Sequence, residues 1–144
     1  MTETKRFSLV KPTLNTPFQI DFEWWKEHDN NWRVFLQSCL CPKHQASFAA
    51  GDSQNWIDWV DPETAEIRLV DGLQHTLMSH CAKQDDFVTP NTTMVDAVFR
   101  VLLAHGNEPM TAIQLGEILN RPPETILRTF SGAQVYKGIR PRHN

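Results

Sequence analysis

Several features are missing from this 144-residue sequence, and each absence excludes a class of protein. No apolar stretch of signal-peptide length follows the N-terminus, and no later run approaches the roughly 18 apolar residues that a membrane-spanning helix needs. There is no internal repeat and no low-complexity tract. We therefore expect a cytoplasmic protein that does not enter a membrane.

A strong positive charge is also missing, because the formal net charge is −3 at pH 7. Residues 1–90 carry 8 Lys and Arg against 13 Asp and Glu, whereas residues 91–144 carry 6 against 4. Most of the basic excess lies at Lys137, Arg140 and Arg142. A local basic face of this size orients docking on a polyanion only weakly.

The composition is otherwise that of a soluble globular protein, with 40% hydrophobic and 22% charged residues. A chain of this length can bury one real core and form one or two compact units. Pro12 and Pro17 interrupt the first residues, so residues 1–17 are expected to form an extended arm. We expect residues 18–88 to form a helical, Trp-rich half, joined by a short linker to residues 91–144.

Periodic patterns predict the elements of the N-terminal half. Apolar residues recur at helical spacing from Phe22, and Pro42 disfavours helical geometry at the residue before it. Two β-type runs flank an Asp-Pro turn, which favours a hairpin. The expected elements are a helix over residues 22–40, a hairpin of strands 56–60 and 67–70, and a helix over residues 72–83.

Capping residues and chain breaks predict three helices in the C-terminal third. Thr92 or Thr93 can cap the first helix, and Gly106 suits the left-handed conformation at its end. Thr111 can cap the second helix, and residues 120–123 break it with two consecutive prolines. The third helix is expected over residues 123–131, followed by a β-type run over residues 134–140.

This succession resembles the winged-helix superfamily, in which a longer helix precedes two short helices and a β-type wing. The resemblance covers residues 91–144 and rests on Gly106, Thr111, Leu115 and the break after Leu119. It implies a mainly α fold class with a small β-hairpin. In this arrangement a winged-helix C-terminal module packs on a helical, Trp-rich N-terminal half.

If the resemblance extends to function, the third helix is the recognition helix and enters the major groove of double-stranded DNA. Its guanidinium group at Arg128 reads a base or grips a phosphate. The protein is then a non-enzymatic DNA-binding regulator. The alternative is a protein-interaction or assembly module on the same scaffold, since fold alone does not decide between them. The implied DNA-contacting residues are Thr125, Arg128 and Thr129 on the helix and Lys137, Arg140 and Arg142 on a reduced wing.

Cysteine and histidine gather in two segments, each at the end of an expected helix. The first segment spans residues 38–44 and the second spans residues 79–81. Zinc is held by four Cys and His ligands, often two from each of two chain segments. The expected ligand set is Cys41, His44 and Cys81, with either Cys39 or His80 as the fourth.

Two other interpretations of these residues stay open. Free cysteine is among the most buried residue types, so the cysteines can be small core residues in a reducing cytosol. An iron–sulfur cluster on Cys39, Cys41 and Cys81, with a histidine as fourth ligand, makes the protein a redox-sensing regulator. Nothing in the sequence marks an oxyanion site, so a catalytic Cys–His pair is not expected.

Five tryptophans fall within the first 59 residues. Trp24 and Trp25 are neighbours, and on a helix they diverge by about 100°, so they cannot face the same core. Tryptophan is frequent in binding hot spots, and Trp24, Trp25 or Trp56 can therefore mark the surface for a homodimer or a protein partner. The alternative is that these rings wrap the N-terminal half and cover the C-terminal helices.

Overall fold

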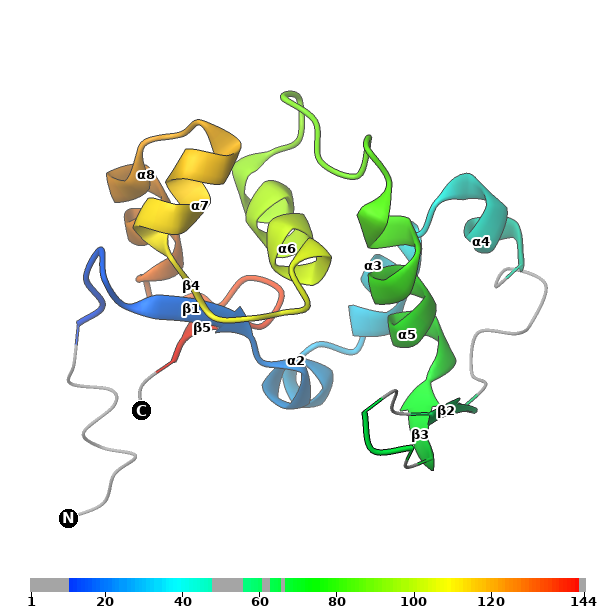
Figure 1. Cartoon of the computed structure of the whole chain (residues 1–144). Coiled ribbons are helices and arrows are strands. Elements are labelled where there is room, and N and C mark those ends of the chain that lie inside the picture. Colours follow the sequence, from blue (N-terminus) through cyan, green and yellow to red (C-terminus); the bar gives the residue numbers. More distant parts are fainter. Residues whose placement is uncertain (1–10, 48–55, 61–62, 66, 143–144) are drawn as a thin grey trace, which may run out of the picture. The chain divides into compact units, whose positions relative to one another are not determined.

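The computed structural model describes residues 11–47, 56–60, 63–65 and 67–142 of the chain. These residues form seven α-helices, a short 3-10 helix and five strands in two antiparallel sheets (Figure 1), so the expectation of a mainly helical fold with a small hairpin is confirmed. None of the described helices has the length and apolar character needed to cross a membrane.

The chain divides into two compact units, which differ from the halves expected from the sequence. Unit 1 comprises residues 1–28 and 88–144, and unit 2 comprises residues 29–87. Residues 18–88, which were expected to form one half, are therefore divided between the two units. Their first strand and first helix belong to the same unit as the C-terminal helices.

A three-stranded antiparallel sheet defines unit 1. Strand β1 (Pro17–Ile20) lies between β4 (Met110–Thr111) and β5 (Ile139–Pro141) (Figure 1). Phe18 and Ile20 of β1 are buried, as alternation along a strand predicts. The expectation that the extended arm reaches residue 17 is thus wrong for Pro17, because this residue opens the central strand and pairs with Thr111.

The β-type run expected over residues 134–140 forms only in part. Before β5, the chain makes a single bridge between Tyr136 and Ile139. Lys137 and Gly138 lie between these two residues and have φ values of 54° and 76°. Two consecutive positive φ values are typical of the tight hairpin turns that match strand twist. A tight turn therefore forms at Lys137-Gly138, and the strand β5 that follows it has only three residues.

Four helices surround this sheet in unit 1, and their caps follow the sequence signals. Thr93 is the N-cap residue of the first C-terminal helix, where its side chain makes no capping hydrogen bond, and Thr111 forms a capping box with Gln114. Gly106 has a φ of 70°, as expected beyond the end of a helix. The helices are α2 (Phe22–His28), α6 (Met94–Ala104), α7 (Ala112–Leu119) and α8 (Pro123–Phe130).

The turn between α7 and α8 depends on two backbone features. Asn120 adopts the left-handed conformation, with φ 56° and ψ 49°. A Cβ atom at Gly116 would lie 2.7 Å from the carbonyl oxygen of Arg121, so a glycine is needed for the chain to turn back this closely. The Arg121 guanidinium in turn donates to the carbonyl of Thr92, at 2.6 Å, and ties this turn to the start of α6.

The helix expected over residues 22–40 is broken in the structure. Helix α2 ends at His28, and α3 (Trp32–Ser38) begins after three residues. The Asp29 side chain accepts a hydrogen bond from the Asn31 N–H, and its carbonyl accepts one from the Trp32 N–H. Asp and Asn side chains bond nearby backbone in this way and compete with helical geometry, which explains the break.

Unit 2 combines three short helices with a hairpin. The predicted hairpin is confirmed as β2 (Trp56–Val60) and β3 (Ile67–Asp71), paired from end to end. The helix expected over residues 72–83 is interrupted at His80, which separates a regular helix from a 3-10 turn. The helical elements are α3, α4 (Pro42–Ser47), α5 (Gly72–Ser79) and η2 (Cys81–Lys83).

The two neighbouring tryptophans of α2 have different environments, as predicted. Trp25 is 1% exposed and packs edge-on against Phe99, with 5.4 Å between ring centroids. Its proposed role on a partner surface is therefore wrong. Trp24 is half-buried and stacks on His28, with 4.0 Å between ring centroids. The side chain of Trp56 lies outside the described part of the structure.

We predict that Gly138→Ala destabilises unit 1, whereas Gly132→Ala does not. A Cβ atom at Gly138 would lie 2.8 Å from the Cβ of Trp25, and its left-handed φ adds strain of about 1–2 kcal/mol for any other residue. A Cβ atom at Gly132 meets nothing within 4 Å. Chemical denaturation of both variants measures the difference, and equal stabilities would contradict the tight approach at Gly138.

Candidate metal centre

Four side chains of unit 2 converge on one point. The ligand atoms of Cys41, His44, His80 and Cys81 all lie within 4.8 Å of one another. Two sulfur and two nitrogen donors therefore meet at distances that one metal ion can span. The group could hold a metal ion, as the sequence predicts for this pair of segments.

The first pair of ligands is positioned by the start of α4. The carbonyl of Cys41 accepts the first helical hydrogen bond, from the Gln45 N–H at 2.9 Å, and Pro42 opens the helix. Proline suits this position because its missing N–H would have no helical partner there. His44 follows Cys41 by three residues, and this spacing brings both side chains to the same side of the helix.

The second pair of ligands depends on the interruption at His80. Neighbouring residues on a regular helix diverge by about 100°, so they seldom approach one ion together. His80 leaves helical geometry, with φ −126° and ψ −63°, and Cys81 begins a 3-10 turn. This change in backbone direction brings both side chains to the same point. The periodic pattern along the chain does not indicate this interruption.

The distances between the ligand atoms match those around a single tetrahedral ion. Bond lengths of about 2.3 Å to sulfur and 2.0–2.1 Å to nitrogen imply separations of roughly 3.8 Å between two sulfurs and 3.6 Å between sulfur and nitrogen. The two Sγ atoms are 3.6 Å apart. Nδ1 of His44 lies 3.2 Å from Cys41 Sγ and 3.5 Å from Cys81 Sγ, and Nδ1 of His80 lies 3.8 Å from Cys41 Sγ.

The pKa values of the Cys41 and Cys81 thiols are shifted in opposite directions. A hydrogen bond from the backbone N–H of His44 lowers the pKa of the Cys41 thiol. The Cys81 thiol donates a second hydrogen bond to the Cys41 sulfur, and this bond also lowers the pKa of Cys41. Burial raises the pKa of Cys81 to about 11. Burial, and then the charges of His80 and Lys43, lower the pKa of His44, so its ring is neutral and can donate a lone pair near neutral pH. Metal binding would therefore displace a proton from Cys81.

Cys39 is not part of this group, which corrects the expected ligand set. It is 2% exposed and caps the end of α3, where its N–H donates to the carbonyl of Leu36. Cys39 caps α3 and Cys41 directly precedes α4, so the two cysteines belong to different helical segments. Only Cys41 reaches the cluster. The fourth residue of the group is His80, and the three cysteines expected for an iron–sulfur cluster do not meet, because Cys39 lies outside the group.

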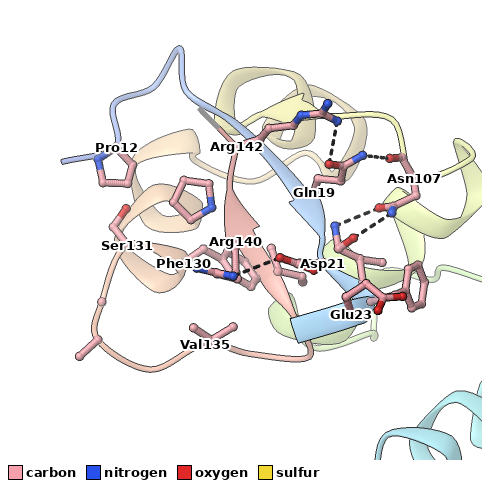
Figure 2. A pocket seen from close by; sticks show the side chains of 16 residues that line it. Pro12, Gln19, Asp21, Glu23, Asn107, Phe130, Ser131, Val135, Arg140 and Arg142 are labelled. Atoms are coloured by element: carbon pink, nitrogen blue, oxygen red, sulfur yellow. Dashed lines mark hydrogen bonds and ion pairs between the residues drawn. The ribbon is translucent and has the colours of Figure 1, made fainter. Parts of the chain in front are cut away.

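The arginines expected to contact phosphates from the wing are engaged within unit 1. Arg140 pairs with the Asp21 carboxylate at 3.1 Å and lies over the Trp24 ring. Arg142 donates to the Gln19 side chain at 2.9 Å. Figure 2 shows both contacts along a groove of about 900 Å³ between β1, β5 and the residues after α8. The groove therefore carries carboxylate and amide groups beside its two arginines.

The residues expected to face DNA from α8 differ in exposure. Arg128 is exposed, whereas Thr125 and Thr129 are half-buried. The Thr129 hydroxyl donates to the Thr125 carbonyl and lies 3.6 Å from the sulfur of Met94, so its expected outward orientation is wrong. A threonine in a helix readily bonds the carbonyl four residues earlier, which accounts for this position. Lys137 is half-buried in the tight turn before β5.

We predict that iodoacetamide labels Cys41 before the other two cysteines in metal-free protein near pH 7.5. The thiolate is the reactive form, and Cys41 combines a lowered pKa with partial exposure, whereas Cys39 and Cys81 are buried. Peptide mapping by mass spectrometry measures the order of labelling. Labelling of Cys81 first, or of all three cysteines at one rate, would contradict the geometry.

The chain matches no protein-family model, no curated protein and no solved structure.

Proposed function

We propose that this is a non-enzymatic protein in which one structural zinc ion is held by Cys41, His44, His80 and Cys81. The observation that carries the proposal is the set of distances between two sulfur and two nitrogen donors, which match a tetrahedron around one ion. Zinc is the common metal for such a ligand set. Structural zinc sites are closed by four protein ligands, whereas catalytic sites keep one position for water.

The same distances argue against a two-iron cluster with two cysteines and two histidines. In such a cluster each pair of ligands binds a different iron, so sulfur and nitrogen atoms of opposite pairs are held apart by the cluster itself. Here His44 Nδ1 lies 3.2 Å and 3.5 Å from the two sulfurs. This spacing leaves room for one ion between the four donors.

The size of unit 2 explains why a metal is useful. The unit has about 60 residues, and domains of this size bury a smaller fraction of their surface than larger domains do. Its described core includes Leu36, Leu73 and Leu77. A zinc ion would link the start of α4 to the end of α5 and add binding free energy to folding, as in other small zinc-stabilised domains.

We predict that the purified protein contains one zinc per chain and that a chelator lowers its melting temperature. Cys41→Ser and His80→Gln each remove one donor and should weaken zinc affinity by at least about 100-fold. Metal analysis and a competition titration with a chromogenic chelator measure both effects.

Two matched substitutions serve as controls for this experiment. Cys39→Ala and His75→Gln change the same residue types on the same segments, outside the four-ligand group. Both should retain zinc. Wild-type protein without bound zinc, or equal zinc loss in the control variants, would contradict the structural-zinc proposal.

A second candidate function is DNA binding by unit 1, as a winged-helix regulator. The observation that favours it is the exposed face of α8, which follows a tight turn and carries Arg128 opposite the buried Ile126 and Phe130. Arg128 has no acidic partner among the described residues and is free to bind a phosphate or a guanine edge. The same exposed face would serve a protein partner in the alternative interpretation.

We predict that the protein binds duplex DNA at low salt and that Arg128→Ala weakens this binding. Each phosphate contact that is lost should reduce the slope of log affinity against log salt by about 0.9. Fluorescence anisotropy across a salt series measures the slope, with Lys83→Ala in unit 2 as a control of equal charge. Absence of binding at low salt would exclude this second candidate.

A further inference from the structure

We propose that Cys41 and Cys81 form a redox pair, in which oxidation by a peroxide joins the two sulfurs in a disulfide and releases the metal. The inference rests on the proposed zinc site and adds regulation of that site. It would make zinc occupancy of unit 2 a function of oxidant concentration. Three features of the cluster support it: the distance between the two sulfurs, the exposure of the four side chains and the position of the third cysteine.

The two sulfurs are already close to bonding distance. They lie 3.6 Å apart, and the Cys81 thiol points at the Cys41 sulfur, to which it donates a hydrogen bond. A disulfide needs a separation of about 2.05 Å, so closure requires a shift of roughly 1.5 Å. Because Cys41 stands ahead of the first turn of α4, rotation of its side chain can supply most of this movement.

Exposure of the cluster is uneven and gives a small oxidant access to one sulfur. His80 is exposed and Cys41 is half-buried, whereas Cys81 is 1% exposed. A peroxide therefore meets Cys41 first. Cys81 is then in position to act as the resolving thiol, because it is shielded from solvent but in contact with Cys41.

The third cysteine does not compete for this reaction. Cys39 is 2% exposed and lies outside the four-residue group, although only one residue separates it from Cys41. The reacting pair is thus Cys41 and Cys81, which come from two distant segments. Their disulfide would preserve the link that the proposed zinc ion provides between α4 and η2. Unit 2 would then lose its metal, but the disulfide would still join the two segments.

The chemistry balances with hydrogen peroxide as the oxidant. The Cys41 thiolate attacks one peroxide oxygen, the O–O bond breaks, and the departing hydroxide takes a proton to give water. The Cys81 thiolate then attacks the Cys41 sulfur, the S–O bond breaks, and a second hydroxide takes a proton. Two thiolates, one peroxide and two protons become one disulfide and two waters. Two neutral histidines remain, which are too few to retain zinc.

The test treats zinc-loaded full-length protein with hydrogen peroxide and follows zinc release with a chromogenic chelator. We expect one zinc released for each Cys41–Cys81 disulfide, a chain lighter by two hydrogen atoms on peptide mapping, and recovery of zinc binding after reduction. Cys39→Ala should behave as the wild type. Cys81→His keeps four zinc donors but removes the resolving thiol, and should release zinc at least about tenfold more slowly.

Each outcome separates the redox inference from the zinc proposal. Wild-type protein that holds one zinc and keeps it under peroxide, or that forms a Cys39–Cys41 or an intermolecular disulfide instead, overturns the redox inference and leaves the zinc site intact. Equal release rates in the wild type and in a zinc-loaded Cys81→His variant also overturn it. Purified protein without zinc overturns the proposed function itself. Disulfide mapping of the wild type decides the inference if Cys81→His does not fold.

Discussion

Unit 1 depends on the pairing of β1 between β4 and β5. The two outer strands have two and three residues, too few to form a stable ribbon without a strand between them. β1 also places Phe18 and Ile20 in the core. The Asn107 side chain accepts a hydrogen bond from the Ile20 N–H and donates one to the Ile20 carbonyl. β1 therefore belongs to the same sheet as β4 and β5 and to the same core as the C-terminal helices.

This pairing makes unit 2 an insertion of about 60 residues between α2 and the C-terminal helices. An insertion of that size has a large surface for its volume and gains little from hydrophobic burial alone. The proposed zinc ion or disulfide would join Cys41 to Cys81 and close the stretch that contains α4, the hairpin and α5. The proposed metal centre would compensate for this limited core, and the proposed disulfide would make the cross-link depend on oxidants.

Elements with strong local signals were predictable from the sequence. Thr111 as a cap and Gly106 as a helix end are each specified within a few residues, so the structure matches them. β1 was not predictable, because four residues show too little alternation and its partners are about 90 to 120 residues away. The helix break at Asp29 was missed because side-chain bonds to local backbone outweighed the apolar period.

By itself, the sequence determined which residue types were available to the site and which two segments carried them, since Cys41 and His44 have a chelating separation. Only the tertiary structure decided that His80, and not Cys39, lies beside the other three side chains. The reason is geometric: Cys39 is held in the core by the end of α3, whereas the departure of His80 from helical geometry brings it beside Cys81. Packing between distant segments, rather than spacing along the chain, brought these four side chains together.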